Sequence, residues 1–124
     1  MDFGMTIPTR GPLAEPQKIE QLARRAEQLG FTYLAVPDHI VVPRKIDSRY
    51  PYSASGDFPG SESGACLDQF SVLTFLAALT KGPRLVSSVT VIPHRGALES
   101  AKLVASIDVL SHGRMTLGVG AGWM

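Results

Sequence analysis

The chain has 124 residues, of which 44% are apolar and 19% charged, and its formal net charge is +1. This composition is typical of a globular domain and argues against disorder, a fibre, nucleic-acid binding or attraction to an anionic membrane. Cys66 is the only cysteine and no apolar stretch reaches the roughly 18 residues of a membrane span, so we expect a cytoplasmic protein without a disulfide or a cysteine-rich metal site.

The first third of the sequence predicts a strand, a helix and a second strand. An apolar-rich run over residues 2–7 is typical of a short strand. A helix is expected over residues 16–29, because Pro16 suits a first helical turn and apolar residues then recur at helical spacing. Gly30 is a left-handed C-terminal cap signal, and residues 31–36 predict the next strand.

A long loop separates this part from the remaining elements. Residues 41–66 are rich in Pro, Gly, Ser and Tyr, and a loop of this length in a compact domain is typically a lid or binding loop. A disordered insertion is the alternative. The β-branched run that follows later predicts a strand covered on both faces. The expected elements are a helix at 67–81, that strand at 84–92, a helix at 97–110 and a strand at 115–119.

The order of these elements predicts the fold class. Strands that alternate with helices indicate an α/β protein with a parallel sheet and right-handed crossovers. Two architectures fit this order: a doubly wound open sheet, and the first four units of a (β/α)₈ barrel. Periodicity alone does not choose between them.

In both architectures the functional residues gather at the C-terminal ends of the strands. Asp38 and His39 follow the second strand, and the imidazole of histidine has a pKa suited to proton transfer near neutrality. The alternative role of His39 is a structural hydrogen bond in a crowded strand end. The three histidines share no metal-binding spacing, so we predict no metal site.

Other candidates come from the remaining loops. The segment 118–122 (GVGAG) is similar to a dinucleotide-binding turn, although that fingerprint follows a first strand and opens a helix. It also fits a place where a flat ring lies against the backbone, or a tight turn. Arg95 and Arg44 are candidates for an anionic ligand group, and Tyr50 and Tyr52 for covering an aromatic ligand.

Several ordered segments resemble the luciferase-like monooxygenase superfamily, and most closely its coenzyme F420-dependent branch. The similarity extends from about residue 15 to the last residue. The segments are FTYLAVPDHIVVP, YPYS, FPG, LDQFSVLTFLAALT, RLVSSVTVIPHR and DVLSHGRMTLGVGAGW.

The resemblance implies a fold and a set of site residues. The family fold is a TIM (β/α)₈ barrel, so residues 1–124 would form a partial domain, about four β/α units from its N-terminal half. By resemblance, Asp38 and His39 are catalytic and lie beside the cofactor ring. Ser87, Ser88 and Val89 occupy the family's strand-three bulge, with Ser88–Val89 as the candidate cis peptide bond. Gly120, Ala121 and Gly122 correspond to the segment near the ring.

The resemblance also implies the chemistry. We expect a small organic substrate and hydride transfer with coenzyme F420; the alternative is an FMN-dependent monooxygenase. A third possibility belongs to another class, a truncated and non-catalytic half-barrel that self-associates or pairs with a complementary half. No nucleic acid or membrane partner is expected.

Overall fold

The computed structural model describes residues 1–43, 45–58 and 64–122. Its four strands form one parallel sheet in the order β1-β2-β3-β4. The elements in chain order are β1 (Gly4–Thr6), α1 (Pro16–Gln28), β2 (Tyr33–Val36), α2 (Gln69–Leu79), β3 (Arg84–Val91), the 3₁₀ turn η1 (Ile92–His94), α3 (Ala97–Leu110) and β4 (Met115–Gly120).

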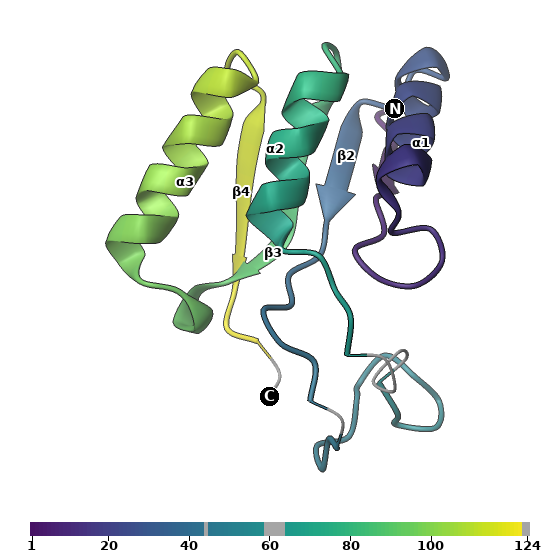
Figure 1. Ribbon diagram of the computed structural model, residues 1–124, viewed down its shortest axis with the longest axis vertical. Coiled ribbons are helices and arrows are strands. Elements are labelled where there is room, and N and C mark those ends of the chain that lie inside the picture. The colour runs from purple at the N-terminus through teal and green to yellow at the C-terminus, as the bar shows by residue number, and fades with distance from the viewer. Residues whose placement is uncertain (44, 59–63, 123–124) are drawn as a thin grey trace.

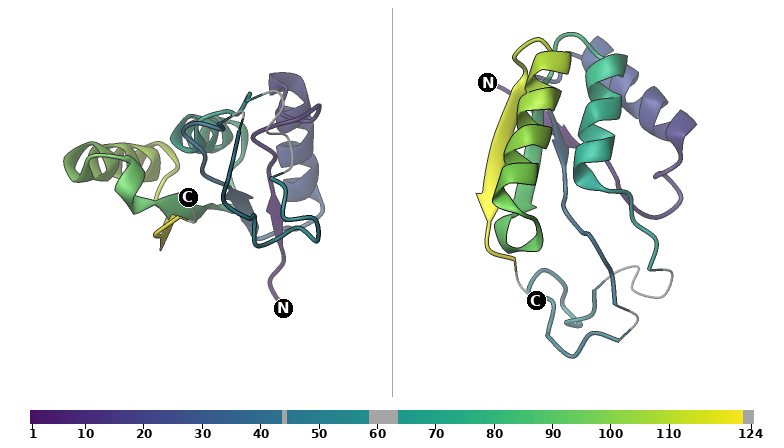
Figure 2. Two further views of the ribbon diagram at one scale, coloured as in Figure 1. Left: turned by 90° about the horizontal axis from the view of Figure 1, so that it is seen from below. Right: turned by 60° about the vertical axis from the view of Figure 1, so that its left-hand side comes forward.

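The three α-helices lie on the same side of this sheet (Figures 1 and 2). A doubly wound fold would instead place helices on both faces and reverse the strand order at a switch point. Sequential strands with helices on one side are the arrangement of a (β/α) barrel. The structure therefore confirms the half-barrel prediction and removes the doubly wound alternative.

Helix α1 begins and ends where the sequence indicated. Pro16 is its first residue. At the other end, Gly30 has a φ of +80° and the Phe31 N–H donates to the carbonyl of Ala26 at 3.0 Å, as in a Schellman motif. Phe31 then packs against the core, so the turn directs the chain back toward the sheet.

Helix α2 is shorter than predicted, Gln69–Leu79 instead of residues 67–81. Asp68 has extended backbone angles and its carboxylate accepts a hydrogen bond from Ser71 N at 2.8 Å, which confirms the capping role that its place in the sequence predicts. Thr80 is also extended and ends the helix. The buried Gln69 amide joins two strands, donating to the Val36 carbonyl and accepting from the Thr90 hydroxyl, both at 2.7 Å.

Strand β3 contains the irregularity that the resemblance predicted. Its register with β4 shifts between Ser87 and Thr90, and the Ser88–Val89 peptide bond is cis. The Ser87 hydroxyl bridges the shift, donating to the Gly118 carbonyl at 2.9 Å and accepting from its N–H at 3.0 Å. The strand ends at Val91 rather than at residue 92, and η1 follows around Pro93, which has no N–H to continue a ladder.

The core lies between the helices and one face of the sheet. Its largest fully buried side chains are Phe70, Ile7, Ile19, Leu34, Leu73, Leu76, Leu85 and Ile107. The prediction that the third strand is covered on both faces is wrong, because Arg84, Ser88 and Val89 are exposed. The β-branched residues of β3 lie in a sheet that the described helices cover on one side only (Figure 1).

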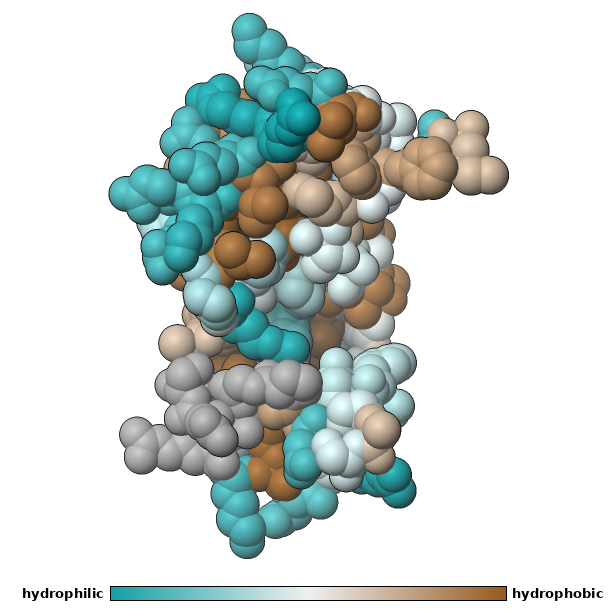
Figure 3. All heavy atoms as spheres, turned by 90° about the vertical axis from the view of Figure 1, so that its right-hand side faces the viewer, coloured by the Kyte–Doolittle hydropathy of each residue, from teal (hydrophilic) through white to brown (hydrophobic). Residues whose placement is uncertain are grey.

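Two surfaces remain uncovered in the described part of the chain. Leu117 and Val119 of β4 are 45% and 58% exposed at the outer edge of the sheet, and Phe3 is exposed beside β1. In the view onto the α1 side, hydrophilic residues cover the helix, and hydrophobic ones appear beside it toward the sheet (Figure 3). Within the described ranges, no helix is long and apolar enough to cross a bilayer.

Candidate functional site

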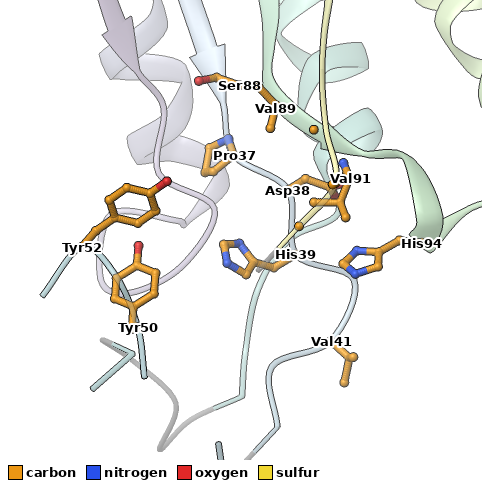
Figure 4. A pocket seen from close by; sticks show the side chains of 13 residues that line it. Pro37, Asp38, His39, Val41, Tyr50, Tyr52, Ser88, Val89, Val91 and His94 are labelled. Carbon is orange, nitrogen blue, oxygen red and sulfur yellow. Dashed lines mark hydrogen bonds between the residues drawn. The ribbon is translucent and has the colours of Figure 1, made fainter. Parts of the chain in front are cut away.

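A pocket of about 510 Å³ opens at the C-terminal ends of the strands. The structure brings seven of the eight predicted site residues into its lining, and Figure 4 shows the tyrosines of loop 41–66 on the opposite side of the pocket from His94. Ser87 alone lies outside the lining, because its side chain is buried in the β3–β4 bridge. The lining residues are Pro37, Asp38, His39, Val41, Tyr50, Tyr52, Ser88, Val89, Val91, His94, Gly120, Ala121 and Gly122.

Asp38 has the contacts of a positioning residue. Its side chain is 0% exposed and forms a two-pronged ion pair with Arg95, with Nη1–Oδ2 and Nη2–Oδ1 distances of 2.6 and 2.8 Å. The Val91 backbone N–H also donates to Oδ2 at 2.9 Å. Asp38 therefore connects the end of β2 to the end of β3. Its catalytic role stays a prediction.

Arg95 has a different role from the one expected. The sequence suggested that it meets an anionic ligand, but its guanidinium binds Asp38 and, through Nη2, Asp68 at 2.8 Å, and it lies 4.9 Å from the centroid of the Phe70 ring. The hydrogen bond to Asp38 is the main cause of its raised pKa. Burial opposes ionisation of Asp68, but hydrogen bonds from Ser71 and Arg95 outweigh it and lower the pKa of that carboxyl. Arg44, the other arginine candidate, lies outside the described residues.

His39 lies between Asp38 and the loop. Burial lowers the pKa of its imidazole, and the positive charge of Arg10 lowers it further, against a smaller opposing effect of Asp38. The ring packs 5.0 Å from that of Phe58, and no hydrogen-bond partner within the described part of the chain reaches its buried Nδ1. The imidazole is therefore predominantly neutral at pH 7, with a ring nitrogen available.

The loop is anchored by an aromatic residue that the sequence analysis did not single out. Phe58 is 4% exposed and its ring contacts His39 and Tyr50, each at a centroid distance of 5.0 Å. Tyr52 packs edge-on against Tyr50 at 5.4 Å. Phe58 is the one phenylalanine between residues 41 and 66, and that was the available signal. This packing holds the tyrosines over the pocket.

Steric contacts explain the glycines of β4 and of the turn that follows it. A Cβ on Gly120 would lie 2.6 Å from Val89 Cγ2, and one on Gly122 would lie 2.9 Å from Val91 Cγ1. A Cβ on Gly118 would collide with the Ser87 carbonyl oxygen. Glycine at every second position therefore allows β4 and the turn after it to lie against the bulge of β3, so that backbone forms much of this wall of the pocket.

Among the residues that the structure describes, no group of three or more His, Cys, Asp or Glu side chains is placed to hold a metal ion. The one cysteine, Cys66, donates its thiol hydrogen to the His39 carbonyl at 3.1 Å, and burial raises its pKa. Its contact stabilises the backbone of the Asp38–His39 turn.

Comparison with known sequences finds a family and relatives. The profile of the luciferase-like monooxygenase family matches residues 1–124. An uncharacterized protein of Mycobacterium tuberculosis is 35% identical over 101 residues, which are 82% of this chain and 36% of that protein. The chain thus spans about a third of the length of this relative.

Comparison with solved structures gives the same fold. The coenzyme F420 dependent tetrahydromethanopterin reductase from Methanopyrus kandleri matches with a TM-score of 0.68 and 26% identity, over 98% of this chain and 27% of that chain. The oxygenating constituent of 3,6-diketocamphane monooxygenase from Pseudomonas putida, in complex with FMN, matches with a TM-score of 0.68 over 100% of this chain and 30% of that chain. Its 17% identity shows the fold alone.

Proposed function

Since the chain belongs to the luciferase-like monooxygenase family, we propose that its pocket holds the flat ring of a flavin-type cofactor, with coenzyme F420 preferred over FMN. The F420-dependent reductase, at 26% identity, supports this preference. The reaction proposed is hydride transfer to or from a small organic substrate. The chain would supply the N-terminal half of the complete site.

The shape of the pocket carries the proposal. One wall consists of Val89 and the segment Gly120–Gly122, where a side chain on either glycine would meet β3. A wall of backbone and one branched side chain suits a planar ring. Tyr50 and Tyr52 cover the other side, and a volume of about 510 Å³ lies within the usual range for ligand sites.

His39 would move the proton in this reaction. Its imidazole is neutral near pH 7, so it accepts a proton from an alcohol-type substrate and returns one in the reverse direction. Asp38, held by Arg95 and Val91, fixes the turn that carries the imidazole. When bound, F420 supplies the hydride chemistry, whereas reduced FMN supplies oxygen activation.

Titration of the chain with F420 and with FMN, followed by cofactor fluorescence, tests the proposal. Tighter binding of F420 supports it, tighter binding of FMN favours the monooxygenase alternative, and binding of neither overturns both. Ala121→Phe is expected to block the ring and weaken binding at least about tenfold. The matched control is Ala101→Phe on α3, an exposed residue outside the lining of this pocket, which should bind as the native chain does.

A second candidate function rests on the open edges of the sheet. Leu117 and Val119 are exposed beside the unpaired side of β4 in the described chain, and an apolar strand edge is a pairing surface. We propose that this edge pairs with a complementary half-barrel or with a second copy. Sedimentation equilibrium tests self-association, and a monomer at micromolar concentration would contradict it. Cytoplasmic location and the role of residues 41–66 as a lid stay predictions.

A further inference from the structure

Arg10 lies in the loop between β1 and α1, close to His39 and to Phe58. Its guanidinium carbon lies 4.2 Å from the centroid of the Phe58 ring. Its Nη1 is buried, and no hydrogen-bond acceptor in the described part of the chain reaches it. Among the described residues, His39 Nδ1 is the other buried side-chain nitrogen or oxygen without a hydrogen-bond partner, and its ring packs on the same phenylalanine.

The other two inward-facing arginines show how this chain normally satisfies a guanidinium. Arg114 donates to hydroxyl or carbonyl oxygens of Ala77, Thr80, Pro83 and Ser111 at distances from 2.7 to 3.1 Å. Arg95 donates to two carboxylates. A buried cationic donor without an acceptor is energetically costly, so the unpaired Nη1 of Arg10 indicates an acceptor that the described residues do not provide.

The charges around Arg10 indicate the chemistry of that partner. Two carboxylates, Asp38 and Asp68, lie near enough to share a neighbour with Arg10: the charges of all three influence the pKa of Cys66. Both are bound to Arg95, and Asp38 also accepts from Val91. Arg10 and His94 are thus positive neighbours of His39, and the two nearby carboxylates, Asp38 and Asp68, are already paired with Arg95. An anionic oxygen is the missing complement.

We propose that Arg10 and His39 together bind the carboxylate or phosphate group of an anionic substrate, so that the site serves small organic acids or phosphate esters. This inference rests on the proposed function, because it names the substrate class of the pocket that His39 lines; Arg10 lies outside that lining and reaches the pocket beside His39. The anion would accept from the guanidinium and from Nδ1–H of His39, which leaves Nε2 for the proton transfer of the proposed function. Both residues are only partly buried.

A histidine NMR titration of the chain, without any cofactor, tests the proposal. The probes are acetate and inorganic phosphate, added in separate arms while the His39 resonances are followed against pH. A bound anion favours the imidazolium, so saturation is expected to raise the pKa of His39. Arg10→Gln is expected to weaken anion binding about tenfold or more, while Arg10→Lys retains part of it. Arg25→Gln, on the exposed face of α1, is the control and should bind as the native chain does.

Two further comparisons keep the proposal falsifiable. Phe58→Leu removes the ring under Arg10 but keeps both donors, so it should still bind the anion; loss of binding in this variant with retention in Arg10→Gln would overturn the proposal. Circular dichroism of each variant establishes folding. An absence of any anion effect on His39 in the native chain would also overturn it.

Competition with cofactors shows whether the bound phosphate belongs to a substrate or to a cofactor. It also tests the Arg10 site separately from the proposed function. Competition by FMN but not by riboflavin would assign the anion site to a cofactor phosphate and overturn the substrate assignment. Ring binding with no anion response would reject only the Arg10 site. An anion response with no ring binding would reject the proposed function and leave the Arg10 site standing. Arg10→Gln is expected to keep ring binding.

Discussion

Removal of the Asp38 carboxylate should be among the most destabilising single changes in this chain. The carboxylate is fully buried, pairs with both Arg95 nitrogens and accepts the Val91 N–H. Breaking a buried pair by removing one partner costs about 3–5 kcal/mol, because the remaining charge is left without compensation. Asp68 still holds one Arg95 nitrogen after the change, so we expect Asp38→Ala to lower the free energy of unfolding by about 3 kcal/mol.

The assay is urea unfolding followed by circular dichroism, with Asp38→Asn and Glu20→Gln beside Asp38→Ala. The asparagine keeps an acceptor for the Val91 N–H and should cost less than the alanine. The Glu20–Arg24 pair has a distance of 2.9 Å, but its side chains are 42% and 54% exposed, so Glu20→Gln should cost well under about 1 kcal/mol. Equal costs for Asp38→Ala and Glu20→Gln would refute the argument from burial.

Three other predictions follow from the geometry. Gly118→Ala should lower the free energy of unfolding by about 1–3 kcal/mol, since its Cβ meets the backbone of the neighbouring strand, whereas Gly96→Ala, with open space around it, should be nearly neutral in the same unfolding assay. Because the pKa of His39 is lowered in the folded state, its contribution to the free energy of unfolding is complete above the usual histidine pKa, about 6.5, and is lost as the pH falls toward the lowered value. His39→Gln should therefore flatten the dependence of the thermal unfolding midpoint on pH over that range. An unchanged profile would contradict this. Phe58→Ala should accelerate tryptic cleavage in the loop, whereas Tyr52→Ala, on a largely exposed side chain, should change cleavage little.

Much of the fold was predictable because its signals are local. Pro16, Gly30 and the helical spacing between them define α1 to within one residue. The boundaries of α2 and β3 differed where single residues left regular geometry, at Asp68 and around Pro93. These departures depend on contacts with other elements, which a periodic pattern does not contain.

The pocket was predictable only in outline. Parallel strands bring their carboxyl ends to one edge, so the positions of Asp38, His39 and Gly120 at one pocket followed from their places after strands. The role of Arg95 did not follow, because its partner Asp38 lies 57 residues away in the chain. The burial of Phe58 was missed for the same reason, since it depends on how the loop folds back.

The sequence by itself determined the alternation of strands and helices, the strand ends that carry polar residues and the family resemblance. All of these depend on neighbours within a few positions. Only the tertiary structure decided that Asp38 belongs to Arg95, that Arg10 and His39 have buried nitrogens without partners, and that the β4 glycines make room for Val89. The physical reason is that side-chain partners are selected by the curvature of the sheet and the return path of the loop, which bring together residues that no local rule connects.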